Sequence, residues 1–141
     1  MIPTTVLRSF LSRCHELAAT AAALGNPAVG ALVVCQNEIV GEGVELARSS
    51  GDVTRHAEIE AVKAAVLFLG TSDLSNCTLV STHEPCVMCS YVIRYHQLEQ
   101  VVFETAVPAV GGVNSKFPVL TDADFWSNKS VPKVEQLGKT G

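Results

Sequence analysis

The sequence predicts an α/β protein, a three-layer α/β/α sandwich built around a mixed sheet of about five strands. Three observations predict this fold class. Apolar residues recur at helical spacing near the start of the chain, two short apolar runs follow as a pair, and a strand–helix–strand pattern fills much of the second half. The 141 residues are 48% hydrophobic, which is enough apolar surface for one core. We therefore expect a single domain over residues 1–141.

The first part of the chain is expected to form a helix and a hairpin. Apolar positions at helical spacing predict a helix over residues 5–24, and Gly25-Asn26-Pro27 ends the pattern. The apolar runs 29–34 and 38–44 predict two antiparallel strands, with Gln36-Asn37 as the turn between them.

The remaining elements alternate between helix and strand. In order, we expect a helix from Ala57 to Gly70, a strand over 78–82, a helix over 86–95, a strand over 100–104, and a strand or docking arm over 131–136. The strand–helix–strand unit implies parallel pairing and a right-handed crossover. Residues 105–124 are rich in Gly, Pro and Ser, so we expect a functional loop that contains a short helix.

Charge and cysteine content narrow the partners and the compartment. A net charge of -4 lacks the basic excess typical of phosphate-backbone binding, so a small neutral substrate is favoured over nucleic acid. The odd number of cysteines argues against a disulfide framework and predicts a reducing, cytoplasmic location. No apolar run approaches the roughly 18 residues of a membrane span, and the Ala-rich segment 17–24 is expected to be helix, not a targeting signal.

Two short patterns carry the expected chemistry, and each lies at the start of an expected helix. They are His56-Ala57-Glu58 and Pro85-Cys86-Val87-Met88-Cys89. Catalytic zinc takes three nitrogen or sulfur ligands and keeps a fourth position for water, which His56, Cys86 and Cys89 would satisfy. The sequence therefore predicts one Zn²⁺ per chain with a bound water or hydroxide.

Glu58 is the candidate for moving protons at this site. It follows His56 by two positions, so on the first turn of a helix it can lie near the metal without being a ligand. A carboxyl group there could take a proton from the water, pass it to a ring nitrogen and later help to protonate departing ammonia. Such a group should have a raised pKa.

The combination of H-x-E and C-x-x-C is the signature of zinc deaminases that act on bases. Together with Asn26-Pro27-Ala28-Val29-Gly30-Ala31 and Glu84-Pro85, these segments resemble the cytidine deaminase-like superfamily, and most of all its guanine deaminase and tRNA adenosine deaminase branch. The resemblance implies the three-layer fold, the zinc, and a homodimer or larger homo-oligomer. It also implies that Asn26 and the backbone N–H of Ala57 bind the substrate ring, and that Phe125 and Trp126 cover the pocket.

The sequence favours hydrolytic deamination of a small nucleobase or nucleoside of guanine, isocytosine or cytosine type, with release of ammonia. A tRNA wobble adenosine deaminase is an alternative, although the acidic charge and the absence of a basic C-terminal helix count against it. A second alternative is a binding module, without catalysis, that zinc stabilises.

Structural interpretations of the same residues stay open. Cys86 and Cys89 could share a structural zinc with His83 and His96. Asn26-Pro27 could simply end the first helix. Phe125 and Trp126 could be core residues.

Overall fold

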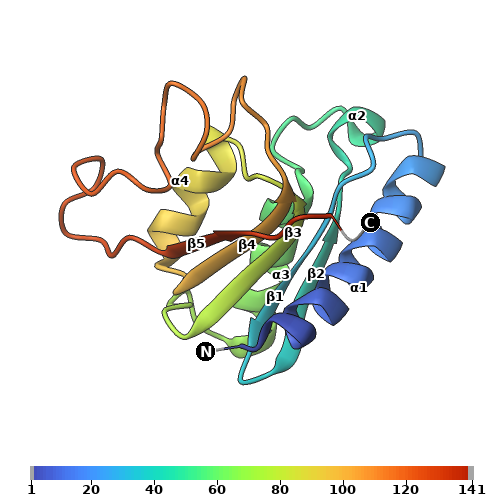
Figure 1. Cartoon of the computed structure of the whole chain (residues 1–141). Coiled ribbons are helices and arrows are strands. Elements are labelled where there is room, and N and C mark those ends of the chain that lie inside the picture. The colour runs from blue at the N-terminus through green and yellow to red at the C-terminus, as the bar shows by residue number, and fades with distance from the viewer. Residues whose placement is uncertain (1, 140–141) are drawn as a thin grey trace.

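The computed structural model describes residues 2–139 and has three layers, as Figure 1 shows. A five-stranded sheet with the order β2-β1-β3-β4-β5 forms the middle layer. Helix α1 (Thr4–Ala23) covers one face, and helices α3 (Ala57–Leu69) and α4 (Val87–His96) cover the other. The predicted α/β/α sandwich is confirmed.

The sheet is mixed. Its strands are β1 (Gly30–Cys35), β2 (Glu38–Val44), β3 (Cys77–His83), β4 (Gln100–Thr105) and β5 (Lys133–Gln136). Strand β1 is antiparallel to β2 and β3, whereas β3, β4 and β5 are parallel to one another. Gln36 and Asn37 join β1 to β2 with φ angles of 52° and 66°, the positive values that a two-residue hairpin turn requires.

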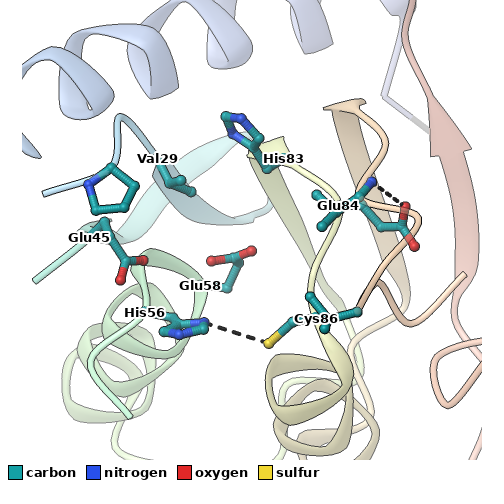
Figure 2. A pocket seen from close by; sticks show the side chains of 10 residues that line it. Val29, Glu45, His56, Glu58, His83, Glu84 and Cys86 are labelled. Atoms are coloured by element: carbon teal, nitrogen blue, oxygen red, sulfur yellow. Dashed lines mark hydrogen bonds between the residues drawn. The ribbon is translucent and has the colours of Figure 1, made fainter. Parts of the chain in front are cut away.

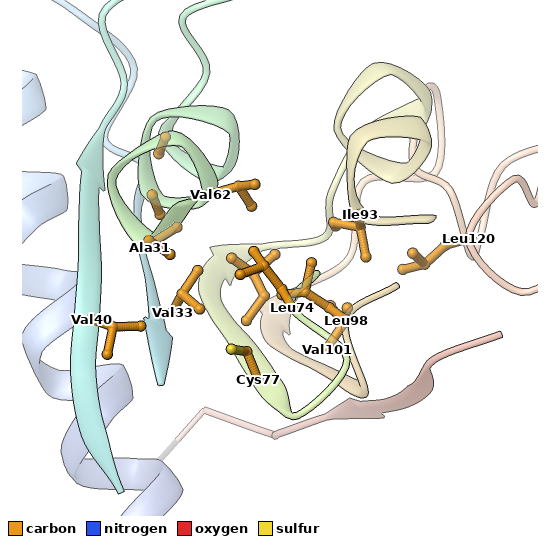
Figure 3. Close-up of a cluster of buried hydrophobic side chains, with 14 residues drawn as sticks. Ala31, Val33, Val40, Val62, Leu74, Cys77, Ile93, Leu98, Val101 and Leu120 are labelled. Carbon is orange, nitrogen blue, oxygen red and sulfur yellow. The ribbon is translucent and has the colours of Figure 1, made fainter. Parts of the chain in front are cut away.

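Side chains alternate along the strands between two cores. On β1, Leu32 and Val34 face α1, while Ala31 and Val33 face α3 and α4. Figure 3 shows the second core, where Val62 of α3 and other apolar side chains meet the sheet. The continuous apolar run of β1 is therefore explained by a strand that is buried on both faces.

Two glycines allow α3 to approach the sheet closely. A Cβ atom at Gly43 of β2 would collide with the carbonyl oxygen of Ala57, and one at Gly41 would collide with that of Ala61. The first turn of α3 therefore rests directly on β2. This contact fixes the position of His56, the residue that caps the N-terminus of α3.

The segment between β4 and β5 differs from the prediction, because residues 106–132 form turns and contain no helix. Hydrogen bonds from buried charged side chains order this segment in place of a helix. Arg94 of α4 is fully buried and donates hydrogen bonds to the carbonyl oxygens of Val119 and Asp122, each at 2.8 Å. These bonds supply the order that helical hydrogen bonds would otherwise give.

The segment between β2 and α3 contains one further short helix, α2 (Ala47–Ser50). Within residues 2–139, none of the helices combines the length and apolar character needed to cross a membrane.

Candidate active site

The three predicted zinc ligands lie together at the N-termini of α3 and α4. His56 precedes α3, Cys86 precedes α4, and Cys89 lies in the first turn of α4. The Nδ1 atom of His56 is 3.5 Å from the sulfur of each cysteine, and the two sulfurs are 3.6 Å apart. Residues that are 30 positions apart in the sequence thus form one compact triangle, which Figure 2 shows in part.

The triangle fits a tetrahedral zinc ion. With Zn–S bonds of about 2.3 Å and Zn–N bonds of about 2.0 Å, ligand atoms at tetrahedral angles are separated by roughly 3.5–3.8 Å. The observed separations match this range. Among the described residues, these three form the group of His, Cys and acidic side chains that could hold a metal ion. Their arrangement makes them the candidate zinc ligands of the chain.

Without metal, this group holds protons that zinc would replace. The hydrogen bond from Cys89, with help from His56, lowers the pKa of Cys86 to about 4, although burial opposes the shift. The hydrogen bond to Cys86 raises the pKa of His56 to about 9, and the same sulfur together with burial raises that of Cys89. Because zinc binds thiolates and neutral imidazole, metal uptake must release protons.

Glu58 lies beside the ligands and is almost completely buried, with 4% of its surface exposed. Burial raises the pKa of its carboxyl group to about 8, and the neighbouring Cys86 thiolate adds to this effect. In Figure 2 the carboxyl group of Glu58 lies above His56 and Cys86 and faces the pocket. The direction of this shift agrees with the raised pKa that the sequence predicts for a proton carrier.

A pocket of about 320 Å³ opens in front of these residues. Such a volume lies at the small end of ligand pockets and suits a single ring system. The described lining residues are Pro27, Val29, Glu45, His56, Glu58, His83, Glu84, Cys86, Val107 and Val110. Valines on several sides give the ring apolar contacts, and polar groups gather near the zinc site.

Glu45 is a pocket residue that the sequence analysis did not single out. It follows β2 directly, is 6% exposed, and accepts a hydrogen bond from the backbone N–H of Ala57 at 3.2 Å. This contact differs from the expectation for Ala57, because its N–H is used by Glu45. In the sequence, Glu45 could have been noticed only as an acidic residue directly after an apolar strand, 11 positions before His56. An acidic residue at a solvent-exposed strand end gives the same pattern, so the sequence alone does not mark Glu45 as a pocket residue.

The side chain of Asn26, which was expected to bind the substrate ring, is paired with Ser49 in the structure. Its side-chain Nδ2 donates to Ser49 Oγ, and its Oδ1 accepts from the Ser49 N–H, each at 2.9 Å. Asn26 is buried and is not among the described residues that line the pocket. The amide anchors the segment around α2 to the end of α1.

The expectation that Phe125 and Trp126 cover the pocket is not met in the structure. Trp126 stacks on Tyr91 of α4, with ring centroids 5.2 Å apart, and Phe125 meets Tyr91 edge to face at 6.4 Å. Arg94 lies over the Phe125 ring. Aromatic side chains of α4 therefore draw both residues onto that helix, and neither is among the described pocket residues.

The alternative structural zinc site is not formed. His83 does line the pocket, but its Nδ1 is hydrogen-bonded to Thr82 Oγ1 at 2.8 Å, and burial lowers its pKa. His96 lies at the other end of α4 with its Nδ1 2.7 Å from the carbonyl oxygen of Ser72. Neither histidine belongs to the candidate metal group.

Comparison with known protein families agrees with this site. The family model described as the cytidine and deoxycytidylate deaminase zinc-binding region matches residues 4–105, which include all three ligands and Glu58. The chain belongs to this family. The predicted superfamily resemblance is confirmed.

Two relatives that are similar in sequence have names that refer to tRNA. A tRNA-specific adenosine deaminase of Aquifex aeolicus is 38% identical over 98 residues, which cover 70% of this chain and 65% of that protein. A tRNA(Ile)-lysidine synthase of Deinococcus radiodurans is 36% identical over 126 residues, or 89% of this chain. The chain spans only 22% of the length of the latter and less than two thirds of the former.

Solved structures with the same fold include both tRNA deaminases and guanine deaminases. A structure from work on A-to-I editing by tRNA:A34 deaminases at the wobble position of transfer RNA has a TM-score of 0.79 and 26% identity, covering 92% of this chain and 98% of that one. Guanine deaminase from Bacillus subtilis has a TM-score of 0.67 and 32% identity, covering 70% of this chain and 64% of that one.

Proposed function

We propose that this chain is a zinc-dependent hydrolytic deaminase that replaces an exocyclic amino group of a nucleobase ring by an oxygen. The observation that supports this most directly is the position of Glu58. The carboxyl group of Glu58 is buried beside the three candidate zinc ligands, in a pocket whose volume suits one ring system.

The residues of the chain divide the reaction between them. Zinc, when bound by His56, Cys86 and Cys89, would supply an acidified water as the nucleophile. Glu58 takes a proton from that water and gives it to a ring nitrogen as the carbon–oxygen bond forms. It then takes the proton of the hydroxyl group now attached to the ring carbon and passes it to the amino nitrogen as the carbon–nitrogen bond breaks, so that water and the aminated ring become ammonia and the oxo ring. The pocket valines Val29 and Val107 hold the ring and exclude bulk water.

The comparisons support the alternative of a tRNA adenosine deaminase better than the small nucleobase or nucleoside that the sequence favoured. The similarity to tRNA-specific adenosine deaminases, and to a tRNA:A34 deaminase structure over 98% of its length, favours adenosine at the wobble position of tRNA. The 32% identity to guanine deaminase and the net charge of -4 favour a free base or nucleoside.

A homodimer and a cytoplasmic location stay predictions, which light scattering and cell fractionation would test.

The test is ammonia release by the zinc-loaded chain. The panel contains guanine, isocytosine, cytosine, cytidine and adenosine, and a tRNA with adenosine at the wobble position is assayed separately for inosine. Turnover of any member that disappears in Glu58→Gln supports the proposal. A zinc-loaded, folded chain that converts none of them would overturn it and favour the binding module.

A further inference from the structure

We propose that Glu45 determines the substrate: its carboxylate accepts a hydrogen bond from a ring N–H next to the amino-bearing carbon, so the pocket selects a ring of guanine or isocytosine type. The inference rests on the proposed deaminase function and deepens it. Adenosine, in tRNA or free, is the competing substrate that the test must exclude.

Glu45 lies on the His56 side of the pocket. It is 6% exposed and lines the pocket together with His56 and Glu58. Figure 2 shows its carboxyl group beside His56, on the side of Val29 and opposite Cys86. Because the reacting carbon must lie against the candidate zinc site and Glu58, Glu45 faces ring atoms close to that carbon.

Glu45 presents hydrogen-bond acceptors, and no free backbone donor, to this side of the pocket. Its Oε1 accepts from the N–H of Ala57 at 3.2 Å, and its Oε2 accepts from the N–H of Ala47 at 3.4 Å. The backbone donor of Ala57 is thereby used, while each carboxylate oxygen keeps a further lone pair. A substrate that binds here must therefore present a donor.

The candidate rings differ in what they present beside the amino group. In guanine and isocytosine, the carbon that carries the amino group is next to a ring N–H. In adenosine and cytidine, the corresponding ring nitrogen is an acceptor, and the only donor on that edge is the amino group that leaves. A buried carboxylate facing a ring acceptor leaves both groups unpaired. Sites built to bind a substrate N–H reject analogues that lack it by factors of about 10⁴.

The decisive substrates are two methylated guanines. Methylation at N1 removes the ring N–H next to the amino-bearing carbon, whereas methylation at N9 leaves that edge intact and serves as the control. For the zinc-loaded wild-type chain we expect kcat/KM for 1-methylguanine to be at least about 100-fold below that for 9-methylguanine. Adenosine should be a poorer substrate than either guanine or isocytosine.

The matching protein variant is Glu45→Gln, which keeps an acceptor for the Ala57 N–H but adds an amide donor. We expect the preference for guanine over adenosine to fall by about 10-fold or more, with unchanged zinc content. Glu42→Gln, three residues earlier on β2, is the control, because Glu42 pairs with Arg13 outside this pocket and should leave the preference unchanged.

The outcomes separate this inference from the proposed function. If the wild-type chain converts no ring, the deaminase proposal fails and this inference fails with it. The wild-type chain could instead be active but convert adenosine, free or in tRNA, better than guanine and isocytosine. That result would overturn only the proposal that Glu45 selects guanine-type rings. Equal rates for the two methylguanines would overturn it as well, and this result does not depend on whether Glu45→Gln folds.

Discussion

Asn114 is joined twice to Glu84: its backbone N–H and its side-chain Nδ2 both donate to the carboxylate, each at 2.8 Å. The N–H groups of Val107 and Val113 donate to the same carboxylate at 2.8 Å. Glu84 lies two residues before the zinc ligand Cys86, and Val107 lines the pocket. One carboxylate therefore connects the zinc segment to the loop that forms the opposite pocket wall.

We expect Glu84→Gln to destabilise the fold by about 2–4 kcal/mol, because glutamine keeps one acceptor oxygen and turns an NH₂ group toward buried N–H donors. Urea unfolding of the zinc-loaded protein at pH 7 would measure the change. Glu38→Gln, at an exposed position of β2, should stay within about 0.5 kcal/mol of wild type. An equally small effect at Glu84 would show that the loop does not depend on this carboxylate.

The same carboxylate makes stability depend on acid pH. Burial favours the neutral form of Glu84, but the hydrogen bonds from Asn114 and the backbone outweigh it and lower the pKa below 4.5. Such a group stabilises the fold above its unfolded pKa, and this stabilisation is lost as the pH falls through the folded pKa. Between pH 5 and pH 3 the wild type should therefore lose more stability than Glu84→Gln, as measured by urea unfolding of the metal-free protein.

Glu58→Gln should keep the fold and the zinc but lose turnover by about 10²–10⁴-fold, because only the proton carrier is removed. Ammonia release and metal analysis on the same sample would check this. Glu60→Gln is the matched control, since Glu60 lies on the same helix but pairs with Arg55. Near-normal turnover by Glu58→Gln would remove Glu58 from the mechanism.

His56→Ala should abolish zinc binding, whereas His83→Ala should leave the zinc content near one ion per chain. His56 presents Nδ1 to both ligand sulfurs, while the Nδ1 of His83 is paired with Thr82. Metal analysis after dialysis gives the result. Loss of zinc from His83→Ala, with retention by His56→Ala, would favour the structural site that the sequence left open.

The elements and the zinc site could be predicted from the sequence because each depends on local signals. Helix α1, the hairpin and the β3-α4-β4 unit follow from periodicity, and His56, Cys86 and Cys89 follow from ligand spacing at helix starts. The substrate contacts could not be predicted in this way. The pairing of Asn26 with Ser49 and the packing of Trp126 on Tyr91 depend on contacts between distant segments, which no spacing in the sequence reveals.

Asn26 could either anchor Ser49 or bind the substrate ring, and two variants distinguish these roles. If Asn26 anchors Ser49, Asn26→Asp should keep activity near the wild-type level, because Asp accepts from both the N–H and the hydroxyl of Ser49. Asn26→Ala should then lower the free energy of unfolding by about 1–2 kcal/mol and reduce activity through the displaced segment. If instead the amide N–H binds the substrate, Asn26→Asp should lose as much kcat/KM as Asn26→Ala while keeping wild-type stability. Steady-state kinetics and urea unfolding on both variants decide between the two, since only a substrate contact lowers kcat/KM without lowering stability.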